Sequence, residues 1–400
     1  MLISKVKNLL RNCPVCECKK GEVLHAQSFL LAESIFLPES YDVVSCVVCG
    51  FVFADTKAKQ KDYDIYYQDS SKYESGITSL GSGVTEHDHK RLEDTAKTIS
   101  NFFPNKSFSI LDVGSANGGL LSEMKKLNYT SLSGLDPSPA CVSYMSEIGI
   151  EGVLGGLFTD NNNLYKKFDG VLLTHVLEHI YDVRVAIANV LNFLKDDGIL
   201  YLEVPDSSKY KDFFISPFYF FDIEHINHFD QDSLTNLFSL FGGNILDIGQ
   251  KDMPISKYGF IPAVYIVFQK NKNKANQKIK QSLVSKDSIL KHIKESTVSI
   301  YSPEVDDLVI SKAPVIVWGA GQATQRSLQN TPLGDTNILF FVDNDKKKQG
   351  IFLKSKEVFP PDKIKENGRA IIIICSGLHG NEIKEQIKSM DLKNKVLLVT

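Results

Sequence analysis

Hydrophobic and polar residues alternate along the middle of the chain in a pattern that predicts buried strands separated by helices. The clearest example is Ile110–Val113, a short apolar run that is followed by a glycine-containing turn at 114–119. Such a run is typical of a strand that is buried on both faces of a sheet. Leu120, Leu121 and Met124 then recur at helical spacing, with charged residues between them. The pattern predicts a strand, a tight turn and the first turns of a helix.

The same alternation continues to residue 269. Further strands are expected at 131–135, 153–157, 168–175 and 199–204, helices at 86–103, 139–149, 182–194 and 231–241, and a last pair of strands at 244–250 and 264–269. Strands that alternate with helices form a doubly wound α/β sheet, and two consecutive strands at its end predict one antiparallel edge.

A second pattern of this kind occupies the end of the chain. Strands are expected at 315–318, 338–342 and 370–374, and the first of them leads into another glycine turn. This predicts a small Rossmann-like α/β domain at 313–400. The segment 271–312 is polar and lysine-rich, with apolar residues at roughly helical intervals, and we expect it to be a helical linker.

Composition limits the class of protein. A chain of 400 residues, 43% apolar and 23% charged, is expected to fold into two or three globular domains. The net charge of -3 gives no general attraction to nucleic acid or to an anionic membrane. No apolar run approaches the roughly 20 residues of a membrane span, and the start of the chain does not resemble a secretory signal. We therefore expect a cytoplasmic protein with neither nucleic acid nor membrane as a partner; the sequence predicts no oligomeric state.

Cysteines are concentrated near the amino terminus, where two CxxC knuckles are formed by Cys13, Cys16, Cys46 and Cys49. Two such knuckles can enclose one metal ion in a closed tetrahedral site. The segment between them is too short for a core of its own, so a metal would supply the missing folding energy. We predict structural Zn²⁺ in a ribbon-like module at 1–60. A redox dithiol is the alternative, and Cys18 is an extra thiol whose spacing fits less well.

Two acidic residues narrow the ligand that the first glycine turn is expected to hold. Asp112 lies at the end of the strand before the turn, where an acid suits an amine-bearing ligand. Asp136 ends the next strand, where an acid can accept both hydroxyls of a ribose. The second feature would serve NAD as well as S-adenosylmethionine (SAM), whereas the first favours SAM.

Four segments, 111–119, 135–137, 175–179 and 194–205, resemble the successive motifs of class I SAM-dependent methyltransferases. With the double CxxC module before them and the Rossmann-like domain after them, the whole chain resembles the sugar C-methyltransferase family. This resemblance implies a doubly wound methyltransferase core at 61–270, SAM as the cofactor and a nucleotide-linked deoxy-keto sugar as the substrate. By motif, it assigns the cofactor site to Asp112, Gly114, Ala116, Asn117, Gly118, Asp136, Leu157 or Phe158, and His175.

The segment Phe220–Phe229 concentrates the candidates for acceptor chemistry. It follows the fifth strand, at the edge where the carboxyl ends of parallel strands line a crevice. The family pattern places a general base at the histidine of a Glu-His pair, which is His225 here, and Glu224 could orient it or raise its basicity. The other candidates are His179 and His228 for catalysis, and Tyr73 and Asp222 for contact with the substrate.

Several of these residues have a plainer interpretation. His175 could simply cap a strand end, and His228 could be bonded to backbone. Tyr73 belongs to an aromatic stretch, Asp62–Tyr73, which predicts either a ligand-binding loop or a packing surface against the cysteine module.

Departures from the family pattern leave the acceptor open. Asp222 stands where the family has a tyrosine, His175 where it has an asparagine, and His228 where it has an aromatic residue. Methylation of carbon beside a ketone requires a stabilised enolate, which the loss of a tyrosine weakens, whereas a hydroxyl needs only a base and alignment. O-methylation of a sugar or glycan-precursor hydroxyl is therefore the main alternative. An NAD-dependent sugar-modifying oxidoreductase, with Asp343 after the second glycine turn, and a non-catalytic scaffold are the others.

Overall fold

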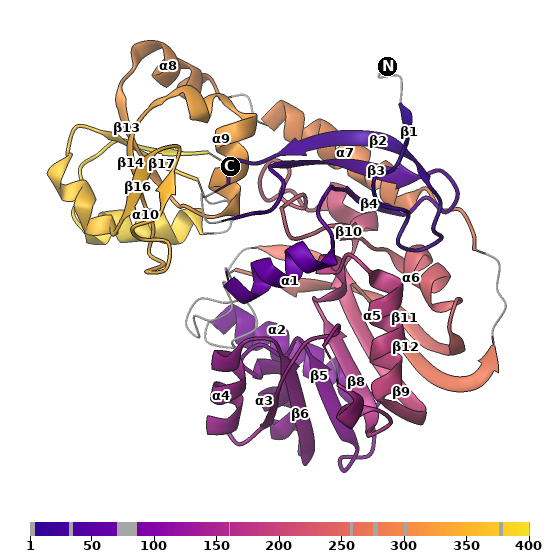
Figure 1. The fold of residues 1–400 in the computed structure, drawn as a ribbon. Helices are drawn as coiled ribbons and strands as arrows, with labels where there is room; N and C mark the ends of the chain where they lie inside the picture. The colour runs from indigo at the N-terminus through magenta and orange to yellow at the C-terminus, as the bar shows by residue number, and fades with distance from the viewer. Residues whose placement is uncertain are drawn as a thin grey trace.

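The computed structural model describes residues 5–31, 35–69, 86–159, 161–256, 259–274, 279–299, 302–375 and 379–399. In these ranges the chain forms three sheets of five, seven and six strands (Figure 1). None of the helices in the described ranges combines the length and the apolar character that a membrane crossing requires.

The seven-stranded sheet forms the middle of the chain and has the order β11-β12-β9-β8-β5-β6-β7. Its strands are β5 (Ser109–Val113), β6 (Ser131–Asp136), β7 (Glu151–Leu154), β8 (Phe168–Thr174), β9 (Leu194–Pro205), β11 (Gly242–Pro254) and β12 (Phe260–Lys274). Strands β5 to β9 are parallel, and β12 runs antiparallel to both β9 and β11. The predicted doubly wound sheet and its antiparallel edge are confirmed. The strand expected at 153–157 is shorter and earlier, because the chain turns at Gly155, whose amide donates to the Asp136 carbonyl (3.0 Å).

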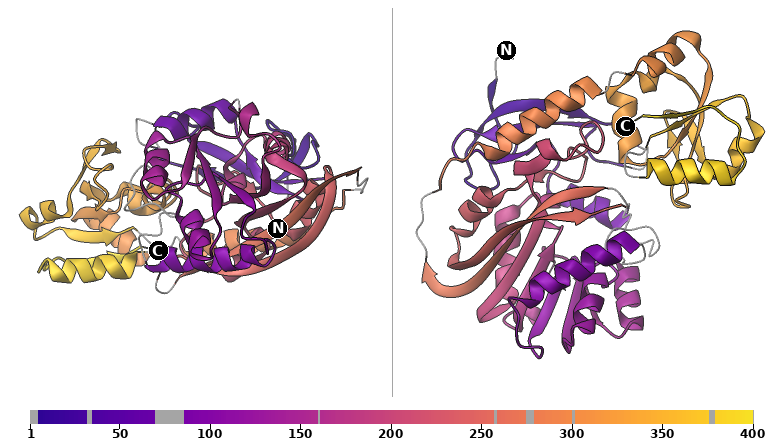
Figure 2. Two further views of the ribbon diagram at one scale, coloured as in Figure 1. Left: turned by 90° about the horizontal axis from the view of Figure 1, so that it is seen from below. Right: turned by 180° about the vertical axis from the view of Figure 1, so that it is seen from behind.

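Helices cover both faces of this sheet (Figure 2). They are α2 (Glu86–Ser100), α3 (Gly119–Lys126), α4 (Pro139–Glu147), α5 (Val183–Phe193) and α6 (Gln231–Phe238). Along β5, Ile110 belongs to the apolar cluster with α2 and α3, whereas Leu111 and Val113 belong to the cluster with α5 and α6. Successive side chains of a strand point to opposite faces, so a continuous apolar run is what a doubly covered strand requires.

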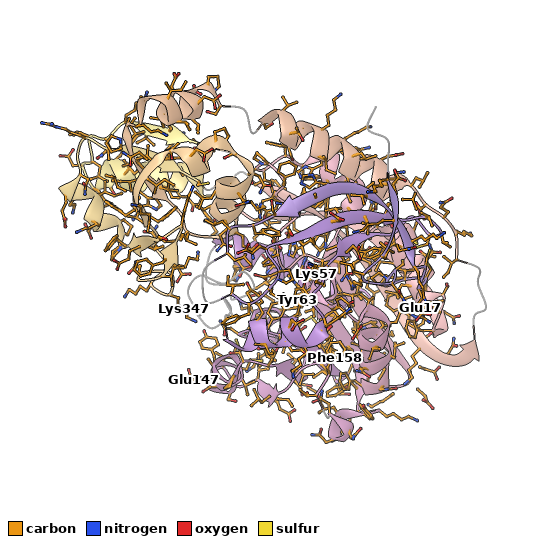
Figure 3. All side chains as sticks on the ribbon, turned by 45° about the horizontal axis from the view of Figure 1, so that its top comes forward. Glu17, Lys57, Tyr63, Glu147, Phe158 and Lys347 are labelled. Carbon is orange, nitrogen blue, oxygen red and sulfur yellow. The ribbon has the colours of Figure 1, made fainter. Side chains whose placement is uncertain are left out.

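The amino-terminal part is an antiparallel sheet that a segment of the core completes. It consists of β1 (Val6–Asn8), β2 (Lys20–Ser28), β3 (Ser40–Cys46), β4 (Val52–Asp55) and β10 (Asn227–His228). In the pairing of β10 with β4, Asn227 lies opposite Phe53 and His228 opposite Val52. Helix α1 (Gln60–Asp69) follows, and its Tyr63 is fully buried near the middle of the molecule (Figure 3).

The segment expected to be a linker is helical, but it is not a free spacer. Helix α7 (Val284–Ser299) runs beside the amino-terminal sheet (Figures 1 and 2), and its Ile289 and His292 are fully buried. The hydroxyl of Ser296 accepts a hydrogen bond from the Phe218 amide (2.9 Å). Strand β12 also extends to Lys274, into the range predicted as linker.

The carboxy-terminal part is the predicted small α/β sheet, with the order β15-β16-β14-β13-β17-β18. Its elements are α8 (Pro303–Ser311), β13 (Pro314–Trp318), α9 (Gln322–Asn330), β14 (Asn337–Val342), β15 (Phe352–Leu353), β16 (Lys356–Phe359), β17 (Ile371–Ile374), α10 (Gly380–Ser389) and β18 (Val396–Leu398). It is tied to the end of β2, where Asn330 Nδ2 donates to the Ser28 carbonyl (2.8 Å) and the Leu30 amide donates to the Gln325 carbonyl (3.2 Å).

Candidate active site

The turn between β5 and α3 is built so that only glycine fits at two positions. Gly114 and Gly118 both have a φ of +73°, which L side chains rarely adopt. A Cβ atom at Gly114 would lie 2.6 Å from Cγ2 of Val176, and one at Gly118 would lie 2.9 Å from Cγ of Met145. The turn thus packs directly on the segment after β8, and it leaves its own backbone exposed to a ligand.

Beside this turn, two buried polar atoms have no hydrogen-bond partner in the protein, and a bound ligand could supply one to each. Asp112 is buried, and its Oδ1 accepts no hydrogen bond. Burial, and then the charge of Asp136, raise the pKa of Asp112 to about 8. The Asn117 amide nitrogen, Nδ2, is also buried without an acceptor. Such groups are costly unless they are paired, so they suit a ligand that carries both a cationic donor and an acceptor.

Asp136 is held by the same turn. Its Oδ2 accepts from the Ala116 amide (2.8 Å), where Ala116 has a left-handed φ of 46°, and its Oδ1 accepts from the Ser138 amide (2.9 Å). Each carboxylate oxygen has two lone pairs, so both can accept a further hydrogen bond from ribose hydroxyls. Of the two residues predicted beside the adenine, Leu157 is buried in the apolar core, whereas Phe158 is half-buried beside it (Figure 3).

His175 is fixed at the end of β8 by strained backbone and by two neighbouring carboxylates. Its φ is 55°, and its amide donates to the Glu203 carbonyl (2.8 Å). Its Nε2 lies 3.2 Å from Glu203 Oε1, and its Nδ1 lies 3.4 Å from Glu178 Oε1. Lys251 contacts the second oxygen of Glu203 (2.7 Å). Burial alone would lower the pKa of His175, but the two carboxylates outweigh it and raise that pKa.

Glu224 connects helix α1 and the carboxy-terminal part to the loop before β10. Its Oε1 accepts hydrogen bonds from the Tyr66 hydroxyl of α1 (2.8 Å) and from Gln322 Nε2 of α9 (2.6 Å). Its backbone carbonyl faces Nδ1 of His179 (3.1 Å). Because a carbonyl oxygen can only accept, Nδ1 of His179 must carry the hydrogen.

The neighbouring His225 stands in a loop that Asp222 shapes. Asp222 Oδ1 accepts from the amides of Glu224 (2.9 Å) and His225 (2.8 Å), and its Oδ2 lies 3.9 Å from His225 Nδ1. The His225 side chain is 26% exposed, and its ring centre is 4.8 Å from that of His179. Asp222 therefore orients the loop, and His225 is open to a ligand.

Two sequence predictions are not supported at this site. His228, predicted to be catalytic, is fully buried in β10, edge-on to Tyr210 and Phe221, and neither ring nitrogen has a hydrogen-bond partner. Burial lowers the pKa of His228 to about 3, so it is a neutral core residue that cannot reach a substrate. The plainer interpretation of a histidine bonded to backbone does not hold either. Tyr73, predicted to contact the substrate, lies outside the described residues.

The sequence analysis missed Tyr66, Gln322 and Glu178. Tyr66 belongs to the aromatic stretch Asp62–Tyr73, for which the sequence predicts either a ligand-binding loop or a packing surface, and whose described part lies in helix α1. Gln322 directly follows the second glycine turn, a position that points toward a ligand crevice in such sheets. Glu178 lies inside the His175–His179 motif, of which only the two histidines were predicted to be functional.

The four cysteines of the two knuckles come together as predicted. Cys13 Sγ is 3.5 Å from Cys49 Sγ, and Cys16 Sγ is 3.4 Å from Cys46 Sγ. All four sulfur atoms lie within 4.8 Å of one another. A tetrahedral zinc with Zn–S bonds of about 2.3 Å places its sulfurs about 3.8 Å apart. The cluster is compatible with zinc, and Cys18 lies outside it, with its sulfur against the backbone of Lys20.

A comparison with protein families identifies the core. Residues 86–248 match a family described as "Methyltransferase domain". The protein is a SAM-dependent methyltransferase. Residues 311–397 of this methyltransferase match a second family, described as "C2185-like, N-terminal". The search of curated proteins gives no match.

Solved structures resemble the methyltransferase core only distantly. One is the 1,6-didemethyltoxoflavin-N1-methyltransferase of Burkholderia thailandensis with S-adenosylhomocysteine, at 15% identity, with 56% of this chain and 98% of that chain covered and a TM-score of 0.40. Another is a SAM-dependent methyltransferase of Archaeoglobus fulgidus, at 17% identity, with 45% and 94% covered and a TM-score of 0.35. Similarity at this level carries no argument about the substrate.

The residues of the first glycine turn fit SAM. The unpaired Oδ1 of Asp112 suits the ammonium group of the methionine part, and Asn117 Nδ2 suits its carboxylate. A SAM molecule in this cradle would supply an electrophilic methyl group next to the segment after β8.

Proposed function

We propose that this methyltransferase transfers a methyl group to carbon of a nucleotide-linked deoxy-keto sugar, with His225 as the general base. The observation that carries the proposal is the contact of Glu224 with both Tyr66 and Gln322. An acceptor bound beside His225 would lie within reach of the carboxy-terminal part, which suits a bulky molecule made of a sugar and a nucleotide.

His225 is the best placed of the predicted bases. It is partly exposed, whereas His179 is buried with its Nδ1 bonded to backbone and His228 is enclosed in the core. Asp222 Oδ2, near His225 Nδ1, would stabilise the imidazolium that forms when His225 takes a proton from the acceptor. Glu224 holds the loop against α1 and α9, so that donor and acceptor are aligned and water is excluded.

A second candidate is O-methylation of a sugar or glycan-precursor hydroxyl. It is favoured by Asp222, which stands where the resembling family has a tyrosine and binds the backbone of its own loop. No tyrosine at that position is available to stabilise an enolate, and a hydroxyl acceptor does not need one.

We also propose that Cys13, Cys16, Cys46 and Cys49 hold a structural Zn²⁺ ion. The proposed division of the chain is a zinc-binding module at 1–60, the methyltransferase core at 61–270, a connecting segment at 271–312 and a Rossmann-like part at 313–400. The proposed compartment is the cytoplasm.

The test is incubation of the purified protein with SAM and nucleoside diphosphate-linked deoxy-keto sugars in deuterated water. C-methylation predicts a product with a new carbon–carbon bond and exchange of the proton next to the ketone. A methylated product without that exchange would replace C-methylation with O-methylation, and no product with any nucleotide sugar would overturn the substrate class.

The base is tested in the same assay. His225→Asn should abolish turnover and leave the affinity for S-adenosylhomocysteine within about twofold, since His225 does not line the predicted cofactor turn. His379→Asn is the matched control, because His379 pairs with Glu382 at the surface of the carboxy-terminal part (2.9 Å). Turnover that survives in His225→Asn removes His225 from the mechanism.

A further inference from the structure

Beside the methyl-transfer site, three side chains form a cluster that the proposed function does not fully use. Glu178, His179 and His225 each offer a ligand atom, and these atoms all lie within 4.8 Å of one another. Two come from the short segment after β8 and one from the loop before β10. We propose that this cluster binds a divalent transition metal ion such as Zn²⁺, separate from the four-cysteine site.

Glu178 supplies the strongest observation. The residue is 1% exposed, and its Oε2 is buried without a hydrogen-bond partner. Its other oxygen, Oε1, lies 3.4 Å from His175 Nδ1 and 3.8 Å from His179 Nε2. A buried carboxylate oxygen without a donor is costly, and a cation removes that cost.

His179 is oriented as a metal ligand would be. Its Nδ1 hydrogen is committed to the Glu224 carbonyl (3.1 Å), so a neutral ring presents the lone pair of Nε2. That Nε2 lies 3.8 Å from Oε1 of Glu178. A lone pair that faces a carboxylate requires a positive charge between them, either a proton or a metal ion. Histidines that bind metals commonly donate their other N–H to a backbone carbonyl in this way.

His225 completes the set from the opposite side. Its Nδ1 is the nitrogen nearer the Asp222 carboxylate (3.9 Å), which leaves Nε2 for the metal. Two imidazoles and one carboxylate are the ligands of catalytic zinc and of non-heme iron, and they leave positions open for a further ligand. Metal bonds of about 2.0–2.2 Å require the three donor atoms to draw together slightly, a movement within reach of side-chain rotation.

The inference goes beyond the proposed function, because it does not depend on which acceptor is methylated. A metal ion here would bind an oxygen of the acceptor and lower the pKa of a hydroxyl there. In the metal-loaded protein His225 is a ligand, so the base role proposed above applies to the metal-free protein.

The experiment is a titration with Co²⁺ of the whole chain carrying one equivalent of zinc, held by the four cysteines, followed by visible absorption and by metal analysis after dialysis. Cobalt in a nitrogen and oxygen site gives weak bands in the visible, distinct from the intense charge-transfer bands of a four-thiolate site. We expect one equivalent of metal in addition to that of the four-cysteine site. Glu178→Gln and His225→Asn should each weaken its binding on the order of 100-fold or more, and the His379→Asn control should not change it.

Retention of the cysteine-bound zinc reports that each variant is folded. If Glu178→Gln loses that zinc as well, His225→Asn decides, since its side chain is partly exposed in a loop. The proposal is overturned if the wild-type protein binds no additional equivalent, in which case a proton lies between His179 and Glu178. It is also overturned if the additional equivalent survives in His225→Asn. No sugar is present in the titration, so failure of the proposed substrate would leave this result unaffected.

Discussion

The ionisation of Asp112 should make cofactor affinity depend on pH. In the free protein, burial and then the charge of Asp136 raise the pKa of Asp112 to about 8, so the carboxyl holds a proton at neutral pH. To pair with the ammonium group of SAM or S-adenosylhomocysteine, the carboxyl must release that proton. Binding therefore competes with protonation, and affinity should rise as the pH approaches 8.

The magnitude follows from the pKa. With a value of about 8, roughly 1% of the Asp112 carboxyls are ionised at pH 6, about 9% at pH 7 and about half at pH 8. The Kd for S-adenosylhomocysteine should therefore fall about ninefold from pH 6 to pH 7 and about fivefold from pH 7 to pH 8, with release of nearly one proton per molecule bound at pH 6.

Isothermal titration calorimetry at pH 6, 7 and 8, in pairs of buffers with different ionisation enthalpies, measures both the affinity and the proton release. Asp112→Asn should bind more weakly at pH 8 and lose the pH dependence. A flat profile in the wild type would refute the reasoning, and a slope that persists in Asp112→Asn would assign the proton to another group, such as Asp136.

Asp112 should also make the stability of the cofactor-free protein depend on pH, but here a rise in pH lowers the free energy of unfolding. Its pKa in the folded state lies above the value near 3.9 of an unfolded chain, so the folded protein binds more protons than the unfolded chain between about pH 4 and pH 8. Without cofactor, the free energy of unfolding should decrease as the pH rises through that window. Urea titrations should show the decrease in the wild type and a smaller one in Asp112→Asn.

Four other substitutions test how the site is built. Gly114→Ala should destabilise the protein by about 2–3 kcal/mol in urea titration and weaken S-adenosylhomocysteine binding in calorimetry, because Gly114 has a positive φ and an added Cβ would meet a valine methyl group. Gly368→Ala, where an added Cβ has no neighbour within 4 Å, is the control and should change neither quantity. Arg11→Met should cost about 1–3 kcal/mol in urea titration, because it removes a buried guanidinium that donates to three carbonyls, of which those of Ile180 and Ile226 keep a second donor. Tyr66→Phe and Gln322→Leu should each lower kcat/KM for the acceptor about 10–100-fold with cofactor affinity unchanged in calorimetry, since both donate to one carboxylate; equal activity would exclude that carboxylate from acceptor binding.

The strands of the central sheet could be predicted because the signal for each of them is local. Each parallel strand is a short apolar run that both faces bury, as Ile110 and Leu111 illustrate by pointing into different apolar clusters. The glycine turn could also be predicted, because the positive φ at Gly114 and Gly118 favours glycine at both positions. Asp112 could be singled out because an acid at a buried strand end is an exception that a ligand has to explain.

The contacts that the core makes with the amino-terminal sheet and with helix α7 could not be predicted from residue type. The pairing of β10 with β4 involves two residues on each strand, too few to show a periodic pattern. Helix α7 looked like a linker because its buried positions include Ser285, Ser288 and Ser296, whose hydroxyls are satisfied by distant partners and whose type does not predict burial. His228 was taken for a catalytic residue because a histidine beside Glu224 and His225 has the right chemistry, and only the three-dimensional structure reveals that aromatic rings enclose it.

These contacts connect the cysteine module to the loops that carry His179 and His225. Arg11, two residues before Cys13, is buried against the ring of Tyr181 and donates to the carbonyls of Ile180 and Tyr181 after β8 and to that of Ile226 in the His225 loop. The two loops also bond to each other, since the Ile226 amide donates to the Glu178 carbonyl (3.0 Å).

A metal ion that orders the Cys13 knuckle would therefore also order the backbone that positions His179 and His225. The cysteine cluster and the loops that carry His179 and His225 are thus linked through one buried guanidinium group, so a metal bound at the proposed site would be coupled to those loops. One face of the sheet that carries the Gly114 turn shares its apolar cluster with the cysteines, whereas the cluster on its other face does not include them. Loss of the metal should consequently reduce turnover before the core unfolds, because that second cluster and the separate sheet remain.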